Sequence, residues 1–419
     1  MASSETFVIA GAGLAGAKAA ETLRAEGFGG RVVLAGAEQR RPYERPPLSK
    51  GLLLGTAGAE SPWVHDAGWY AAHDVELRTG VTVTAIDRGG RAVVAGPERI
   101  AYDKLLLATG SSPRRWPGPG GDLAGVRYLR TWEESLALAG ELAAGRRVTV
   151  LGSGWIGLEV AAAARERGAE VTVVTPAPAP LHRILGERIG GMIAGLHREH
   201  GVTFRFGTRV RELLGDDHVR RVLLDDWTAV ETDLVVVGIG AVPNVGLATR
   251  AGLAVDGGVL VDARHRTSDP AIFAAGDIAA VQHPLYGRRV RVDHWADALH
   301  SGPAAARSML DIGTPWARVP YFFTDQYDLG LEYAGLLDPA VTYDVVVRGD
   351  LDKRECLVFW THEGRIAAGM NVNVWDVTDR IQDLIAAGTR IDPARLADPS
   401  VPLEELALGE PTGEGPTRS

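Results

Sequence analysis

The sequence contains very little cysteine, because Cys356 is the only one among 419 residues. A single thiol excludes an intrachain disulfide and a redox-active cysteine pair. Cys356 lies in the apolar stretch ECLVFW, which favours a small buried residue of a strand over a reactive thiol. We also expect no metal site.

Positive charge and long apolar runs are scarce as well. The net charge is −9, whereas nucleic-acid binding draws on clustered Lys and Arg, so we expect no nucleic-acid partner. No run approaches the roughly 20 apolar residues of a membrane-spanning helix. The apolar start TFVIAGAGLAGAKAA does not predict a signal peptide, because Glu5 stands where basic residues belong. We therefore expect a cytoplasmic protein.

Glycine, in contrast, is abundant, and two glycine-rich segments are the most informative parts of the chain. The first follows a short strand, Phe7 to Ala10, and opens a helix from about Leu14 to Glu26, before a strand at Arg31 to Ala35. Its candidate cofactor contacts are Gly11, Gly13, Ala15 and Gly16. In this strand–turn–helix context the spacing predicts a dinucleotide whose pyrophosphate lies against the helix N-terminus.

The second segment, LGSGWIGLEVAAAA, repeats this plan about 140 residues later, with Gly152, Gly154 and Gly157 in the turn. A strand precedes it in RRVTVLG and another follows in AEVTVVT. Two such units imply two dinucleotides, and a chain of this length is expected to form two or three domains. A second unit kept only for structure is the alternative.

The connections predict that the second nucleotide domain is inserted into the first. A buried strand, Lys104 to Ala108, ends in a small-residue turn where the chain could leave the first domain, and Asp233 to Asn244 offers a similar strand and turn for the return. Ile272 to Ala279 is a strand ending in Gly-Asp, which would direct the Asp277 carboxylate at polyol hydroxyls.

From about Val319 alternating strands predict an antiparallel sheet, followed by a helix from Asp376 to Ala387.

Seven segments in this order resemble one family. They are AGAGLAGAKAA, PYERPPLSK, LLLATGSSPR, LGSGWIGLEVAAAA, IFAAGDIA, VDHWADAL and YFFTDQYDLGLEYAGL. They resemble the FAD-dependent, NAD(P)H-using ferredoxin reductases of bacterial oxygenase systems, the family of the putidaredoxin and rubredoxin reductases. The resemblance runs from Phe7 to about Leu406, and PYERPPLSK and the DQYD segment are its most specific parts.

The resemblance implies an α/β fold with two Rossmann-like dinucleotide-binding domains and a C-terminal α+β interface domain. FAD binds at the amino-terminal unit and the nicotinamide cofactor at the inserted one. We expect residues 1–114 and 239–316 to form the FAD domain, 115–238 the NAD(P)H domain, 317–408 the interface domain and 409–419 a flexible tail. In related flavoproteins the interface region supports dimers, and the sequence leaves a homodimer open.

The segment PYERPPLSK is expected to bring positive charge to FAD. Its prolines stiffen the backbone, and Arg45 and Lys50 face phosphate or the flavin edge; the resemblance places Lys50 beside the isoalloxazine. Glu159, assigned to the first turn of the second helix, is then expected to form an ion pair with Lys50 near flavin N5. A solvated surface lysine and simple stabilisation of the helix start are the alternatives.

Further contacts follow from the resemblance. Asp277 is expected to hydrogen-bond the ribityl or pyrophosphate region of FAD, with a helix cap as the alternative. Arg130 in YLRT and Val83 in VTVTAID match FAD-contacting positions, and either could be structural. Trp155 is expected to cover the flavin or gate the nicotinamide, and Trp295 to shield the ring or pass single electrons; packing is the alternative for both.

The positions that read the ribose depart from the rule of an acid about 20 residues beyond the glycines. In the FAD unit Glu38 is the only nearby carboxylate, and in the nicotinamide unit the strand ends in Thr175. No arginine directly follows Thr175 to receive a 2′-phosphate, and Arg183 and His182 are the nearest candidates. We expect NADH, because the family mostly uses it, and leave NADPH open.

The expected partner is a ferredoxin or rubredoxin-type electron carrier. An acidic carrier needs a basic surface, for which the candidates are Arg40, Arg41, Arg288, Arg289 and Arg291; a solvated charged face is the alternative. Two other functions share the architecture. A flavin disulfide or peroxide reductase needs a cysteine near the flavin, and a protein similar to apoptosis-inducing factor would serve partly as a binding protein.

Overall fold

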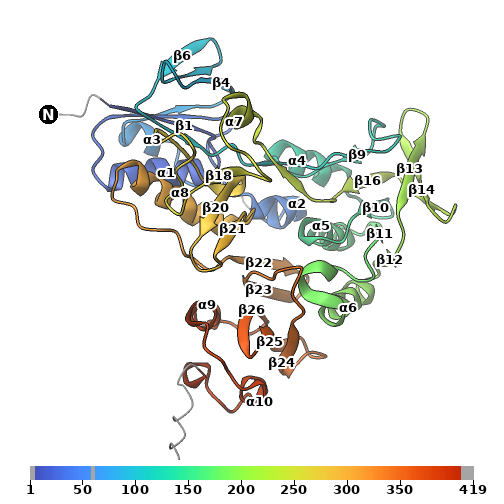
Figure 1. The fold of residues 1–419 in the computed structure, drawn as a ribbon. Coiled ribbons are helices and arrows are strands. Elements are labelled where there is room, and N and C mark those ends of the chain that lie inside the picture. Colours follow the sequence, from blue (N-terminus) through green and yellow to red (C-terminus); the bar gives the residue numbers. More distant parts are fainter. Residues whose placement is uncertain (1–4, 58–61, 407–419) are drawn as a thin grey trace, which may run out of the picture. The chain divides into compact units, whose positions relative to one another are not determined.

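The computed structural model describes residues 5–57 and 62–406, which form two compact units (Figure 1). The first unit comprises the chain up to Leu181 together with Ile193–Arg318, and the second comprises His182–Met192 together with the chain from Val319. The predicted tail at 409–419 lies outside the described residues. No helix within 5–57 and 62–406 is long and apolar enough to cross a membrane.

The first unit contains two parallel five-stranded sheets. The amino-terminal sheet has the order β19-β7-β1-β2-β3, with β1 Thr6–Ala10, β2 Arg31–Ala35, β3 Val75–Arg78, β7 Lys104–Leu107 and β19 Ile272–Ala274. The inserted sheet has the order β12-β11-β10-β16-β9, with β9 Val126–Arg127, β10 Arg147–Leu151, β11 Glu170–Val174, β12 Thr203–Arg205 and β16 Leu234–Val237. Four strands of each sheet share one order, β3-β2-β1-β7 and β12-β11-β10-β16, as expected for nested dinucleotide-binding domains. The fifth strands differ, because β19 comes last in its sheet along the chain and β9 comes first.

Helices and smaller sheets complete each half of the first unit. The amino-terminal half has α1 Leu14–Ala25, η1 Pro46–Ser49, α2 Gly51–Leu54, α3 Trp69–Ala72, β4 Val83–Asp87, β5 Ala92–Ala95, β6 Glu98–Ala101, α7 Gly246–Arg250, β18 Val259–Val261, η2 Gly276–Ile278, β20 Ala279–His283, β21 Arg288–Val290 and α8 Trp295–Met309. The inserted half has α4 Trp132–Glu141, α5 Trp155–Glu166, β13 Val210–Gly215, β14 Val219–Leu224 and β15 Ala229–Glu231. Helix α6, His182–Glu199, is divided, because its residues up to Met192 belong to the second unit. Gly186, at φ +77°, interrupts α6.

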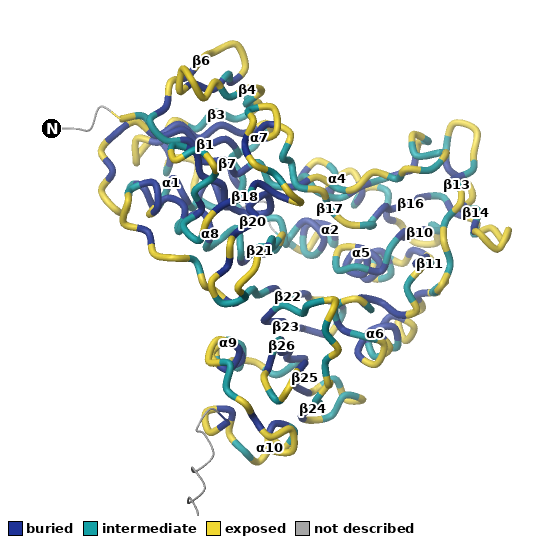
Figure 2. The backbone as a smooth tube through the Cα atoms, viewed as in Figure 1, coloured by how far each residue is buried: buried dark blue, intermediate teal, exposed yellow. Residues whose placement is uncertain are grey.

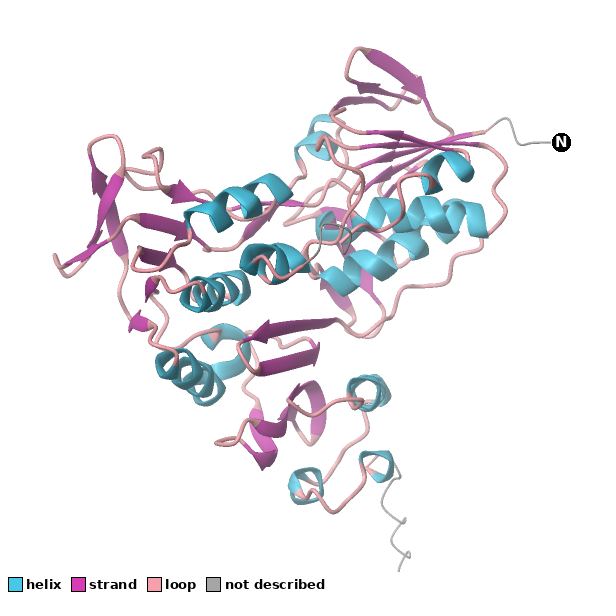
Figure 3. Cartoon of the chain, turned by 180° about the vertical axis from the view of Figure 1, so that it is seen from behind, coloured by secondary structure: helices cyan, strands magenta, loops and turns pink. Residues whose placement is uncertain are grey.

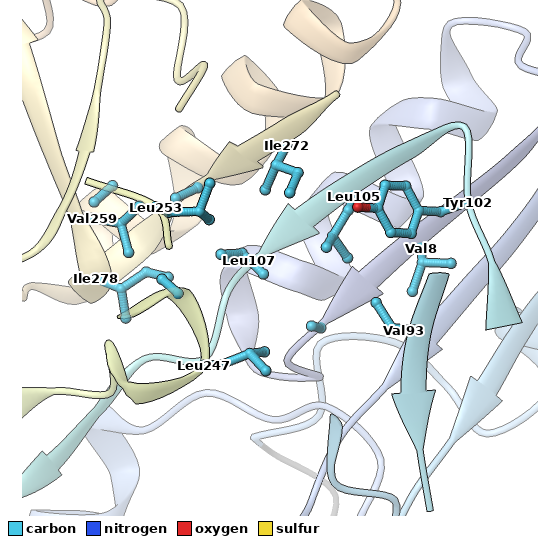
Figure 4. Packing of buried hydrophobic residues seen from close by; sticks show 14 of the residues in the cluster. Val8, Val93, Tyr102, Leu105, Leu107, Leu247, Leu253, Val259, Ile272 and Ile278 are labelled. Carbon is cyan, nitrogen blue, oxygen red and sulfur yellow. The ribbon is translucent and has the colours of Figure 1, made fainter. Parts of the chain in front are cut away.

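Hydrophobic packing fixes the amino-terminal sheet. The strands β1, β2, β7 and β19 are largely apolar and buried because both faces are covered, whereas the edge strand β3 is half polar and partly exposed (Figure 2). Leu105 and Leu107 of β7 pack with Val8 of β1 and Ile272 of β19 (Figure 4). On the other face α1 and α8 lie side by side (Figure 3). A Cβ atom at Gly302 of α8 would lie 2.2 Å from the Ala15 carbonyl oxygen, so this helix pair requires small residues.

The two connections between the halves form what we call the crossover ribbon. It pairs β8 (Ser111–Pro113) with β17 (Ala241–Pro243) in antiparallel register. Asn244 fastens it: its Nδ2 donates to the Thr109 carbonyl oxygen at 2.9 Å, and Ser112 Oγ donates to its Oδ1 at 2.8 Å. The predicted exit and return of the chain therefore lie next to each other, and the nested insertion is confirmed.

The second unit has an antiparallel sheet of order β22-β23-β26-β25-β24, with β22 Tyr321–Gln326, β23 Leu329–Gly335, β24 Asp344–Asp350, β25 Glu355–His362 and β26 Arg365–Val372. Its helices are α9 Thr378–Ala387, α10 Pro393–Ala397 and η3 Leu403–Glu405. α9 packs against β23 and β26, which confirms the predicted sheet with helical cover. Cys356 is buried in β25, and burial raises the pKa of its thiol to about 11.

Candidate nucleotide and electron-transfer site

The turn after β1, which we call the first cradle (Gly11–Gly16), is tight on one side and open on the other. Gly11 has φ +126°, and a Cβ atom there would lie 2.0 Å from the Ala108 carbonyl oxygen. A Cβ atom at Gly16 would lie equally close, 2.0 Å, to the Gly11 carbonyl oxygen. At Gly13, the N-cap of α1, a Cβ atom would meet nothing within 4 Å. Among the described residues no side chain caps this helix, so no side-chain acceptor competes for its first amides.

The second cradle (Gly152–Gly157) has the same construction. Gly152 has φ +99°, and a Cβ atom there would lie 2.4 Å from the Gly238 carbonyl oxygen. At Gly157 it would lie 2.6 Å from the Gly152 carbonyl oxygen, and at Gly154 it would meet nothing within 4 Å. No side chain of the described residues caps α5 either. Each cradle therefore presents an open helix N-terminus that suits a pyrophosphate.

A cluster of charged side chains lies next to the first cradle. Gly276 approaches Ala15 there, and the neighbouring Asp277 accepts hydrogen bonds from Ser111 Oγ at 2.5 Å and Arg130 NH2 at 2.8 Å. Burial by itself raises the pKa of Asp277, but Arg130, Ser111 and Arg45 outweigh it, so its pKa lies below the usual range. Asp277 is thus an anion held ready for hydroxyl or amide donors.

The same cluster continues through PYERPPLSK. Arg45 forms an ion pair with Glu38 at 2.7 Å and also donates to the Arg130 carbonyl oxygen. Tyr43 donates to Glu38 and accepts a hydrogen bond from the Trp132 amide at 3.1 Å. The predicted residues Glu38, Arg45, Arg130 and Asp277 are therefore brought together beside the first cradle.

Lys50 and Glu159 form an ion pair, with 2.7 Å between Nζ and Oε1. Glu159 is buried, with 4% of its side chain exposed, compared with 18% for Lys50. The placement of Glu159 in the first helical turn is wrong, because α5 begins at Trp155 and its first turn contains no acidic residue. The helix start therefore does not account for this carboxylate.

Packing explains how this pair forms across the two halves. The segment η1–α2 belongs to the amino-terminal half by sequence, yet Leu53 of α2 is fully buried in the core of the inserted half with Leu138 and Val160. α2 contacts both α4 and α5. Burial of α2 thus places Lys50 directly against α5.

The ribose end of the second cradle contains hydroxyl groups instead of charges. Ser153 Oγ donates to Thr175 Oγ1 at 3.1 Å, and both side chains are buried. Thr175 therefore supports the turn from inside. Arg183 is exposed at the start of α6, in the segment that belongs to the second compact unit.

The remaining predicted contacts occupy varied positions. Trp155 and Trp295 are the first residues of α5 and α8, and both are half-buried. Burial raises the pKa of Glu44 and the Trp295 indole counteracts it, which places Trp295 beside PYERPPLSK. Val83 is half-buried against the hydrophobic core of the amino-terminal half. The Ala15 side chain is buried, so only its backbone can contact a ligand.

The predicted basic surface is largely engaged within the chain. Arg40 pairs with Glu133 at 2.6 Å and lies over the Trp132 ring, while Arg41 lies over the Trp63 ring. Arg291 donates to the Asp277 carbonyl oxygen at 3.1 Å, and Arg289 donates to the Val261 carbonyl oxygen at 3.1 Å. Arg288 is exposed on β21.

The arrangement fits two dinucleotides. Both helix N-termini are open, and the Nε atom of Arg130 is buried without a hydrogen-bond partner in the described part of the chain. A ligand acceptor beside the first cradle would satisfy this donor. In residues 5–57 and 62–406 no group of three or more His, Cys, Asp or Glu side chains could hold a metal.

Sequence reasoning did not find Ser49, Ser111 and Tyr43. Ser49 donates to Oε2 of Glu159 at 2.5 Å, Ser111 binds Asp277, and Tyr43 binds Glu38. Ser49 and Tyr43 lie inside PYERPPLSK and Ser111 inside LLLATGSSPR, which were singled out as whole segments. The polar residues of those segments were thus a usable signal.

Comparison with known proteins gives consistent results along the whole chain. The family model described as pyridine nucleotide-disulphide oxidoreductase matches residues 5–302, and the model described as reductase C-terminal matches residues 321–407. The ferredoxin–NAD(+) reductase component of the anthranilate 1,2-dioxygenase system of Burkholderia cepacia is 43% identical, over 96% of this chain and 99% of that protein.

Two further relatives bear on function. The reductase in the crystal structure of the covalent putidaredoxin reductase–putidaredoxin complex matches with a TM-score of 0.92 and 37% identity, over 97% of this chain and 99% of that one. Human apoptosis-inducing factor 3 is 35% identical, over 93% of this chain and 64% of that protein.

Proposed function

Because the chain belongs to the pyridine nucleotide-disulphide oxidoreductase family, we propose that it passes electrons from NADH through FAD to a small iron-sulfur ferredoxin or rubredoxin that feeds an oxygenase. The observation that carries this proposal is the Lys50–Glu159 ion pair, which joins the two halves that hold the open cradles. The chain has one cysteine, so no cysteine pair can take electrons from the flavin.

FAD belongs at the first cradle. Amides at the start of α1 bind its pyrophosphate, Asp277 and Arg130 bind its ribityl and phosphate region, and Glu38 with Arg45 lies towards its ribose. Val83 and the Ala15 backbone complete this set of proposed contacts. Bound FAD accepts two electrons as hydride and can release them singly.

The nicotinamide cofactor belongs at the second cradle, and the protein must hold its reacting carbon close to the flavin. Lys50 presents an ammonium group to the flavin edge, and Glu159 holds that ammonium in place. We assign Trp155, at the start of α5, to the nicotinamide side and Trp295 to the far edge of the flavin.

NADH is the proposed donor, with NADPH as the alternative. Neither a carboxylate nor an arginine directly follows β11, and the Thr175 hydroxyl already accepts a hydrogen bond from Ser153. The residue that would exclude a 2′-phosphate is therefore missing. Residues 1–114 and 239–316 form the FAD domain, 115–238 the nicotinamide domain and 317–408 the interface domain in this proposal.

We place the protein in the cytoplasm, where NADH and ferredoxins are available. Similarity to human apoptosis-inducing factor 3 favours a second candidate, an NADH-binding flavoprotein whose main role is to bind a partner. The two differ in the fate of the electrons, because only the reductase delivers them rapidly and singly to a ferredoxin.

Anaerobic titration of the purified yellow protein with NADH, and separately with NADPH, tests the proposal. We expect one equivalent of NADH to bleach the flavin absorbance, and two equivalents of an oxidised [2Fe–2S] ferredoxin, each accepting one electron, to restore it within the turnover time. A colourless protein or a flavin that NADH leaves oxidised would contradict the proposal. Reduction by NADH without transfer to any ferredoxin would support the partner-binding candidate.

A further inference from the structure

Glu159 is held by two consecutive residues, of which only Lys50 has a proposed role. Ser49 Oγ lies 2.5 Å from Oε2 of Glu159, and Lys50 Nζ lies 2.7 Å from Oε1. Counted over the whole residue, Ser49 is 3% exposed and Glu159 is 5% exposed. A hydroxyl that donates to a buried carboxylate makes a short, charge-assisted hydrogen bond, which is stronger than a hydrogen bond between two neutral groups.

The two residues lie at a junction between helices. Ser49 is the last residue of η1, and Lys50 directly precedes α2. Lys50 has φ −120° and ψ −112°, an irregular conformation between η1 and α2, and both side chains reach the same carboxylate. The chain thus adopts an unusual local geometry at the point where the two halves meet.

We propose that Ser49 is a positioning residue for electron transfer: by holding Oε2 it fixes the Glu159 carboxylate, and through Oε1 it fixes the Lys50 ammonium at the flavin edge. This inference rests on the proposed function. A lysine side chain has four rotatable carbon bonds, so its position depends on the group that anchors its charge. Loss of the hydroxyl removes the hydrogen bond to Oε2, which loosens the carboxylate and, through Oε1, the ammonium.

The test compares Ser49→Ala with a matched control in the FAD-loaded protein. Ser135 of α4 is also buried and donates to the Leu48 carbonyl oxygen at 2.6 Å, so it fastens the same segment without using Glu159 as its partner. We expect Ser49→Ala to slow flavin reduction at saturating NADH about tenfold, with the apparent dissociation constant of NADH within about twofold of the parent. Ser135→Ala should stay within about twofold of the parent in both measurements.

Two further variants separate positioning from folding. Ser49→Thr keeps the hydroxyl and should restore the rate to within about threefold, whereas Ser49→Cys keeps the size with a weak donor and should stay slow. In a Glu159→Ala background, Ser49→Ala should add less than about twofold, because a residue that acts through Glu159 has nothing left to position. FAD content and the flavin absorbance spectrum report whether each variant is folded and loaded.

The outcomes distinguish this inference from the proposed function. If NADH does not reduce the parent flavin, the proposed function fails. If NADH reduces the parent and Ser49→Ala at equal rates, Ser49 has no positioning role while the function stands. Equal slowing by Ser135→Ala, a slow Ser49→Thr, or a full additional effect in the Glu159→Ala background would also overturn it.

Discussion

The first cradle lies beside the charged side chains Glu38, Arg45, Arg130 and Asp277, whereas the second is supported at its ribose end by the hydroxyls of Ser153 and Thr175. The glycine turns themselves are alike, with one open helix N-terminus each. The difference suits a cofactor that stays and one that leaves. In the proposed assignment, the network of charges would hold FAD through many turnovers, while a nicotinamide cofactor held mainly by backbone amides would dissociate after each reduction.

The largest difference between the two cradles is expected from substitution of Asp277 at the first cradle. Asp277→Ala removes the carboxylate that pairs with Arg130, so the largely buried Arg130 guanidinium loses this ion pair. We expect a loss of roughly 3 kcal/mol in the free energy of unfolding and purification with little FAD. Thermal unfolding and the ratio of flavin to protein absorbance measure both effects.

The control for this prediction is Thr175→Ala at the second cradle, which removes a neutral hydroxyl and should leave FAD bound. Asp277→Asn, which keeps the shape, should fall between Asp277→Ala and the parent. Full FAD occupancy in Asp277→Ala would show that the charged cluster does not hold the flavin.

Acid should affect the amino-terminal half through His265. Its ring is buried and its Nδ1 lies 3.0 Å from the Ala274 carbonyl oxygen, and burial lowers the pKa of His265 to about 4 from its ordinary 6.5. In the unfolded chain His265 becomes protonated below about pH 6.5, whereas in the folded chain it stays neutral down to about pH 4. The free energy of unfolding therefore decreases as the pH falls from 6.5 to 4. The full effect is roughly 3 kcal/mol.

Chemical denaturation at several pH values measures this effect. His265→Asn tolerates the φ of +60° at this position and cannot gain a proton, so its stability should depend less on pH between 6.5 and 4. An unchanged pH dependence in this variant would assign the acid sensitivity to other groups.

Alanine substitutions at the open glycines, Gly13 and Gly154, test which cofactor each cradle binds. At Gly154 a Cβ atom meets no protein atom within 4 Å, so Gly154→Ala should fold normally and raise the KM for NADH about tenfold by occupying space at the helix N-terminus. Gly13→Ala should instead weaken FAD retention. Steady-state kinetics and FAD release on dilution measure the two effects, and Gly140→Ala, at another open position, is the control.

An exchange of these phenotypes would contradict the assignment of the two cofactors. If Gly154→Ala lost FAD while Gly13→Ala raised the KM for NADH, FAD would belong at the second cradle. Normal behaviour of both variants would show that neither helix N-terminus contacts a pyrophosphate.

The smallest expected effect concerns the electron carrier. Arg288 and Arg289 are both exposed on β21, and Arg289 also donates to a backbone oxygen. Arg288→Glu should raise the apparent KM for an acidic ferredoxin about threefold at low salt, with the difference lost at high salt and flavin reduction by NADH unchanged. No change at low salt would remove β21 from the docking surface.

The glycine spacing predicted both cradles because the turn geometry depends on residues that are close in sequence. Ser49 and Glu159 are far apart along the chain, and their contact depends on Leu53 of α2 packing into the core of the other half. No periodicity in the sequence signals that packing. The family resemblance supplied the partner of Lys50, and the position of Glu159 beyond the first turn of α5 required the structure.

The crossover ribbon has a consequence for engineering. Since β8 and β17 pair with each other, Pro113 and Ala241 are register partners, and all of the chain between them leaves and re-enters the amino-terminal half at one place. Residues 114–240 are therefore a cassette with adjacent splice points. Its replacement by the matching cassette of an NADPH-selective relative should transfer the donor preference when the contacts between the halves are kept, among them Arg130–Asp277, Lys50–Glu159 and the packing of α2.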